Sequence, residues 1–101
     1  MKLRDATADD LAAIEALLHA CELPAAGVAE HIGNFVVVDD PEGGLVACAG
    51  LECYGDSALL RSVAVAEVVR GGGVAASMVA RLLEDCRARG ISNMALLTVS
   101  A

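Results

Sequence analysis

Aromatic and basic residues are both scarce in this chain. Its 101 residues include one tyrosine, one phenylalanine and no tryptophan, so aromatic residues make up 2% of the sequence. Proteins that bind single-stranded nucleic acid stack bases on aromatic side chains, so this composition argues against that function. Lys and Arg number 7 against 14 Asp and Glu, which gives a formal net charge of -7. The electrostatic field of this net negative charge repels nucleic acid and anionic membranes. If the chain binds an anionic ligand, the local field of a loop must attract it.

Long uninterrupted apolar runs and cysteine motifs are also missing. No apolar stretch of about 18 residues is free of charges, so we expect no membrane span. The charged start of the chain, Met1 to Asp5, leads into a predicted helix and does not resemble a signal peptide. The 4 cysteines form no C-x-x-C pair and no zinc-type cluster with histidine. We therefore expect reduced thiols, no metal and a cytoplasmic protein.

The composition, 56% hydrophobic, is sufficient for one domain, residues 1–101, with a core of Ala, Val and Leu. The spacing of apolar and turn residues predicts a fold of the α/β class with a mixed sheet. Helices are expected from the Thr7–Asp10 capping box to about Ala20, over 26–31, and over 72–89. Strands are expected over 2–5, 34–39, 45–54, 57–65 and 92–99. The element order is β-α-α-β-β-β-α-β.

Consecutive glycines, Gly71-Gly72-Gly73, lie at the start of the last predicted helix. Each costs about 1 kcal/mol relative to alanine if it is helical. Glycine lets bare backbone N–H groups approach a ligand closely at the positive end of a helix dipole, which suits a phosphate or pyrophosphate. A flexible strand-to-helix turn is the simpler alternative.

Two familiar phosphate-binding loops fit this segment poorly. A P-loop requires a lysine after its glycines, and none follows here. The dinucleotide-binding pattern G-x-G-x-x-A matches Gly71, Gly73 and Ala76, but the next strand ends at Ser100 without a carboxylate for the ribose. The preceding strands also read as a hairpin meander, so a dinucleotide-binding fold remains the weaker alternative.

The segment Arg70-x-x-Gly73-x-Ala75 resembles the [Q/R]-x-x-G-x-[G/A] motif of the GCN5-related N-acetyltransferases. The element order also resembles this family from its first strand to its fifth, so the resemblance covers essentially the whole chain. It implies an N-acetyltransferase that uses acetyl-CoA as cosubstrate. It further implies that the backbone of Val63 and Val65 holds the pantetheine arm. The implied pyrophosphate-binding residues are Arg70, Gly71, Gly72, Gly73, Val74 and Ala75.

At the level of branches, the segments Leu23–Gly27, Gly50–Asp56 and Leu59–Val65 are similar to bacterial acetyltransferases associated with arsenic-resistance operons. This similarity implies acetyl transfer to the amine of a small, amino-acid-like substrate, including an arsenic-containing toxin. Members of the family continue after the fifth strand with a helix and two strands. These normally contribute the tyrosine that protonates the CoA thiolate. We expect this chain to be a fragment, a homodimer paired through its last strand, or an inactive remnant that binds CoA or oligomerises.

Glu52 and Arg61 lie inside otherwise apolar predicted strands. With Gly55–Asp56 as the hairpin turn, Glu52 lies diagonal to Arg61 on one sheet face, which Tyr54 shares. Both charges are costly to bury unpaired. One interpretation is an ion pair that only stabilises the sheet. The other is an acceptor site in which Glu52 is the catalytic base, while Arg61 and Tyr54 bind substrate.

Two further placements follow from the sequence. His31 is expected on the surface, with a place in the acceptor cleft as the alternative. The positions of Cys48 and Cys53 differ by an odd number, so their side chains are expected on opposite sheet faces.

Overall fold

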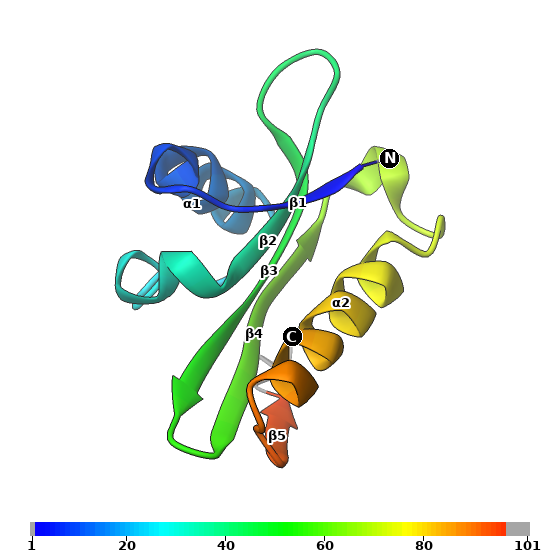
Figure 1. The fold of residues 1–101 in the computed structure, drawn as a ribbon. Helices are drawn as coiled ribbons and strands as arrows, with labels where there is room; N and C mark the ends of the chain where they lie inside the picture. Colours follow the sequence, from blue (N-terminus) through cyan, green and yellow to red (C-terminus); the bar gives the residue numbers. More distant parts are fainter. Residues whose placement is uncertain (1, 97–101) are drawn as a thin grey trace.

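The computed structural model describes residues 2–96, and within them a 5-stranded sheet has the order β1-β2-β3-β4-β5 (Figure 1). Strands β1 to β4 pair antiparallel, and β5 pairs parallel to β4. The predicted α/β fold class and its mixed sheet are therefore confirmed. Residues 97–99 of the last predicted strand lie outside the described residues. The strands are β1 Leu3–Asp5, β2 Phe35–Asp39, β3 Leu45–Tyr54, β4 Ser57–Val65 and β5 Asn93–Leu96.

The helices differ from the prediction at the second helix and at a short 3-10 helix, Glu67–Val69, that was not predicted. The predicted first helix is found as a 3-10 turn that continues into an α-helix ending at Ala20, and the Asp10 carboxylate accepts the Thr7 N–H at 2.7 Å. The second helix, expected over 26–31, is found as a 3-10 helix over Ala29–Asn34. It begins later than predicted because Gly27 has φ +83°, a conformation that an α-helix cannot contain. The helices are η1 Ala8–Asp10, α1 Leu11–Ala20, η2 Ala29–Asn34, η3 Glu67–Val69 and α2 Val74–Ala88.

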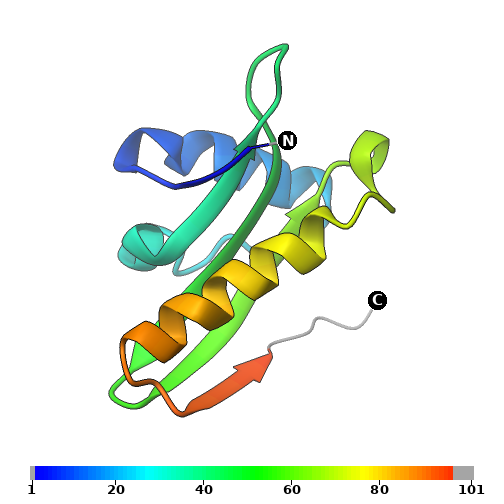
Figure 2. The same cartoon turned by 45° about the vertical axis from the view of Figure 1, so that its right-hand side comes forward.

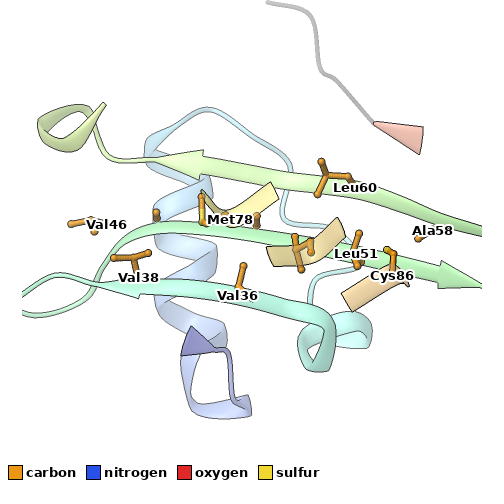
Figure 3. Close-up of a cluster of buried hydrophobic side chains, with 11 residues drawn as sticks. Val36, Val38, Val46, Leu51, Ala58, Leu60, Met78 and Cys86 are labelled. Carbon is orange, nitrogen blue, oxygen red and sulfur yellow. The ribbon is translucent and has the colours of Figure 1, made fainter. Parts of the chain in front are cut away.

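Helices α1 and α2 cover opposite faces of the sheet (Figures 1 and 2). Figure 3 shows the core on the α2 side, where Met78 of α2 and Leu51 of β3 are fully buried. The core on the α1 side contains Phe35 and Cys48, whereas Cys53 packs on the α2 side, so the predicted opposite orientation of the two cysteines is confirmed. None of the described helices is both long and apolar enough to cross a membrane.

The α2-side core consists of buried residues from β2, β3, β4 and α2: Val36, Val38, Val46, Ala47, Ala49, Leu51, Ala58, Leu60, Met78, Leu82 and Cys86. The α1-side core consists of Ile14, Leu17, Leu18, Val28, Phe35, Val37, Cys48 and Ala64. Because Ala, Val and Leu dominate both, the composition of the core agrees with the sequence.

An irregularity in β4 separates its two halves. The register shifts between Cys48 and Gly50 of β3, so that Ser62 and Val63 of β4 have no β3 partner. Ser62 adopts φ +57°, a left-handed conformation that is uncommon outside glycine and often marks a functional site. Among the described residues, the last β5 partner of β4 is Leu60. Ser62 and Val63 therefore leave the regular ladder, and Ala64 and Val65 pair with β3 again before the chain reaches the glycine loop.

Candidate functional site

The glycine loop precedes α2 as the sequence predicts, but the helix begins after it. Gly73 is the N-cap, with φ +79°, and Gly71 has φ +86°. A Cβ added at either residue would meet nothing within 4 Å, so the loop faces open space. The first turn of α2 carries no acidic side chain. Its N–H groups are consequently available to an anionic ligand at the positive end of the helix dipole.

A depression of about 690 Å³ borders this loop. Its floor combines apolar side chains with the polar backbone of the loop, and the side chain of Val68 at its rim is 88% exposed. The residues present thus fit a ligand that joins an anionic group to less polar parts. The lining residues are Leu3, Val38, Val68, Val69, Arg70, Gly71, Gly72, Val74 and Ser77.

Arg70 is directed back at the protein. Its Nε donates to the backbone carbonyl of Val65 at 3.0 Å, and its Nη2 lies 3.9 Å from Sγ of Cys21. Arg70 thereby connects the glycine loop with the end of β4 and with the end of α1. Cys21 is a neighbour of the loop that the sequence did not indicate, because the contact joins residues far apart along the chain.

Glu52 and Arg61 meet as their strand positions predict. Glu52 pairs with Leu59 in the β3–β4 register and Arg61 with Gly50, so the two charges are diagonal neighbours. Arg61 donates from Nη1 to Oε1 of Glu52, and from Nε to Oγ of Ser62 at 3.1 Å. Glu52 is 9% exposed and Arg61 8%. The predicted ion pair is therefore present and almost fully buried.

Tyr54 completes this cluster from the exposed side. Its hydroxyl donates to Oε2 of Glu52 at 2.5 Å, although the residue is 58% exposed. This hydrogen bond and the one from Arg61 hold the pKa of Glu52 below its usual value, against the opposing effect of burial. The same bond raises the pKa of Tyr54. While both donors hold it, Glu52 is an ionised carboxylate and a weak base.

The segment between α1 and β2 covers this ion pair, which the sequence did not reveal. A Cβ added at Gly27 would lie 3.0 Å from Nη1 of Arg61, 3.4 Å from Oε1 of Glu52 and 3.7 Å from Oε2 of Glu30. His31 is half-buried, with its ring edge-on to Tyr54 at a centroid distance of 6.2 Å. The sequence favoured a surface position for His31 and kept the acceptor cleft as the alternative, and the structure places the residue half-buried against the cluster. A Pro-Ala-Ala-Gly segment carries no local signal for such a contact.

The two groups of candidate residues lie along the same strand. Arg61 lies just before the irregular part of β4, and Val65 at the end of the strand is about 13 Å away at strand spacing. The Glu52–Arg61–Tyr54 cluster is on the α1 side of the sheet, whereas the glycine loop lies at the end of β4 and the start of α2. In residues 2–96 no His, Cys, Asp and Glu side chains gather as ligands for a metal ion.

Residues 5–101 match the acetyltransferase (GNAT) family. The chain belongs to this family. Its GNAT fold agrees with the element order predicted from the sequence, and the family assignment covers both the glycine loop and the Glu52–Arg61 pair. A comparison with curated proteins gives no match.

Solved GNAT structures superpose on nearly all of this chain. Rv2747 from Mycobacterium tuberculosis, in complex with CoA and NLQ, is 27% identical with a TM-score of 0.82, over 99% of this chain and 66% of that chain. A GCN5-related N-acetyltransferase from Kribbella flavida is 25% identical with a TM-score of 0.75, over 99% of this chain and 31% of that chain. N-acetylglutamate synthase from Neisseria gonorrhoeae, complexed with coenzyme A and N-acetyl-glutamate, is 24% identical with a TM-score of 0.82. The match covers 96% of this chain and 25% of that chain. This last likeness shows the fold alone.

This GNAT chain thus spans less than two thirds of the length of these relatives. The family and the fold predicted from the sequence are confirmed. The arsenic-resistance branch and the roles of individual residues stay predictions.

Proposed function

We propose that this chain is an acetyl-CoA-dependent N-acetyltransferase domain that acetylates the amine of a small, amino-acid-like molecule. The observation that carries the proposal is the glycine loop, in which Gly71 and Gly73 are left-handed and face open space at the start of α2. Amides arranged in this way bind phosphate groups. The CoA complex of Rv2747, a relative of 27% identity, supports CoA as the source of the pyrophosphate.

The cofactor half of the site would combine loop and strand. The N–H groups from Gly71 to Ala75 would hold the pyrophosphate, as the open loop geometry allows. The pantetheine arm would bind the β4 backbone, where Val63 has no β3 partner. The carbonyl of Val65 already accepts from Arg70, which makes Val63 the stronger candidate of the two. Acetyl-CoA supplies the thioester, whose acetyl carbon joins the amine nitrogen while its C–S bond breaks.

The acceptor half would be the Glu52–Arg61–Tyr54 cluster. Arg61 is suited to an anionic group, since a guanidinium holds a carboxylate through two parallel hydrogen bonds. Glu52 would take one proton from the acceptor's ammonium, directly or through water, so that the nitrogen lone pair becomes available. The nitrogen releases a second proton as the amide forms, which balances the proton taken up by the leaving thiolate. Tyr54, exposed at the cluster's edge, would contact the acceptor.

The finer predictions of the sequence belong to this proposal. The resemblance of the segments Leu23–Gly27, Gly50–Asp56 and Leu59–Val65 to the arsenic-resistance branch favours an acceptor such as an arsenic-containing amino-acid-like toxin. A cytoplasmic location and a homodimer formed through the last strand accompany it. A remnant that binds CoA without transferring acetyl groups is the alternative.

Calorimetric titration with acetyl-CoA, with NADH in parallel, tests the cofactor assignment. Release of free thiol from acetyl-CoA in the presence of a panel of amino acids then tests transfer. Binding of acetyl-CoA with amine-dependent thiol release is the expected result. Binding without release would favour the inactive remnant. A response to NADH alone would instead favour the dinucleotide-binding alternative and contradict the proposal.

A further inference from the structure

The ion pair occupies the two groups that the proposed chemistry needs. Among residues 2–96 the buried charged side chains are Glu52 and Arg61, and they hold each other. Both oxygens of Glu52 accept hydrogen bonds, one from Arg61 and one from Tyr54. In this arrangement Glu52 is a weak base, and one of the two N–H groups of Arg61 Nη1 is already taken.

One nitrogen of Arg61, Nη2, nevertheless remains able to bind an incoming oxyanion. Nε donates to Ser62 and Nη1 to Glu52, whereas Nη2 donates to no protein group in the described part of the chain. An oxyanion can therefore make a first hydrogen bond to Nη2 before it reaches Nη1. Gly27 carries no side chain, so the covering segment places no Cβ at the position 3.0 Å from Nη1.

The surrounding charges would orient an incoming molecule. Tyr54 of β3 and Arg61 of β4 donate hydrogen bonds to Glu52. His31 of η2 packs against Tyr54, and Oε2 of Glu30 would lie 3.7 Å from a Cβ at Gly27. Arg61 is the permanent cation of this group, and Glu52 and Glu30 are its carboxylates. An ammonium is attracted to the carboxylates, and an oxyanion is attracted to Arg61.

We propose that Arg61 exchanges partners during catalysis: it holds Glu52 in the free protein and transfers to an oxyanion of the acceptor, which releases Glu52 toward the acceptor's amine. The inference rests on the proposed function and deepens it, because it names the acceptor class as amines that also carry a carboxylate or a similar oxyanion. A plain amine lacks the group that displaces Glu52 and leaves the base locked.

The exchange would also activate the base. Released Glu52 loses the hydrogen bond from Arg61 and gains a negative neighbour, and both changes raise the pKa of a carboxyl group. The proton from the ammonium then moves to the Glu52 carboxylate, which becomes a neutral carboxylic acid, and the ammonium becomes a neutral amine. No further reactant is needed for this step.

Binding of propionate, a carboxylate without an amine, tests the exchange by calorimetry, with propionamide as the uncharged probe. Glu52→Gln keeps the side-chain shape but removes the competing charge, so this variant should bind propionate at least about tenfold more tightly than the wild type. Arg61→Gln should bind none. Glu42→Gln removes one charge in the exposed β2–β3 turn and should behave as the wild type. Equal propionate binding by Glu52→Gln and wild type would overturn the exchange.

A second measurement uses the unmodified chain, in case Glu52→Gln does not fold. In ¹³C NMR titrations of the side-chain carboxyl, saturating propionate should raise the pKa of Glu52, and propionamide should leave it unchanged. An unchanged pKa under saturating propionate would contradict the proposal.

Neither measurement requires acetyl-CoA, so the two proposals fail separately. Propionate exchange without any acetyl transfer would contradict the proposed function. Acetyl transfer at equal rates to L-alanine and L-alaninamide would contradict the exchange alone.

Discussion

The guanidinium of Arg70 donates from Nε to the backbone carbonyl of Val65 at 3.0 Å. This hydrogen bond closes the path from the end of β4, through η3, to the glycine loop. The two elements proposed to hold acetyl-CoA are therefore joined by a side chain as well as by the backbone. Arg70, the first residue of the sequence motif, fixes the geometry of the loop in this structure.

We expect Arg70→Ala to weaken acetyl-CoA binding about tenfold, because both the tether and a nearby positive charge are lost. Because Arg70 is exposed, the substitution should change the protein's free energy of unfolding by no more than about 0.5 kcal/mol. Calorimetry and urea unfolding measure the two effects. Arg87→Ala, an exposed position near the end of α2, removes the same charge and is the control. An identical loss in both variants would mean that net charge, and not the tether, matters.

Gly73→Ala should abolish acetyl-CoA binding, whereas Gly90→Ala should not. The two glycines have similar left-handed conformations, φ +79° and +73°, and a Cβ at either meets nothing within 4 Å. Both variants should therefore lose about 1 kcal/mol of folding free energy. Gly73 precedes the first amides of α2, whereas Gly90 follows the helix. Thermal unfolding should show the same loss of folding free energy in both variants. Retained acetyl-CoA binding by Gly73→Ala would show that the loop is not part of the cofactor site.

Gly50→Ala should destabilise the fold, since a Cβ at this position would overlap the ring of Phe35. Overpacking of this kind costs about 1–3 kcal/mol, which chemical denaturation can measure. Gly33→Ala is the matched control, because a Cβ there has no neighbour within 4 Å. The double variant with Phe35→Leu should recover part of the loss. A Gly50→Ala protein as stable as the wild type would show that the ring can move aside.

Acid should weaken the connection between β1, β2 and the start of α1. Arg4 bonds to Asp10 at 2.8 Å and to Asp39 at 2.7 Å, and these hydrogen bonds lower the pKa of both carboxyl groups. Carboxyl groups with a lowered folded-state pKa stabilise the fold above their unfolded pKa. This stabilisation is complete above about pH 5 and is lost as pH falls through the lowered values.

The variant Asp10→Asn should therefore show a flatter dependence of unfolding free energy on pH between about pH 5 and pH 2. Urea unfolding at a series of pH values measures this slope. Asp9→Asn, at the exposed neighbouring position, should keep the slope of the wild type. Equal slopes in all three proteins would show that the Arg4 ion pairs contribute nothing.

The regular part of the fold was predictable from local patterns. The strands 45–54 and 57–65 were predicted with the bounds that the structure shows, because Gly55–Asp56 marks the turn and the flanking residues are strongly apolar. The same register placed Glu52 beside Arg61. Periodicity also located α1 and α2 to within two residues at each end, apart from the 3-10 turn that opens the first helix.

The irregular part was not predictable, because it depends on contacts between distant residues. The left-handed Gly27 delays the expected second helix and brings its segment onto the ion pair. The left-handed Ser62 and the register shift beside Gly50 have no local signature either. These features surround the candidate acceptor site. Sequence patterns therefore indicated which residues form the cluster but not what covers it.

The proposed sites for acetyl-CoA and for the acceptor are supported by different hydrophobic cores. The glycine loop extends from α2, whose buried side chains belong to the α2-side core, whereas Gly27 and His31 cover the acceptor cluster on the α1 side. Strands β2, β3 and β4 contribute buried residues to both cores. Changes of charge in segment 22–34 that keep the buried Val28 should accordingly redirect acceptor choice and leave the cofactor loop and its supporting helix intact.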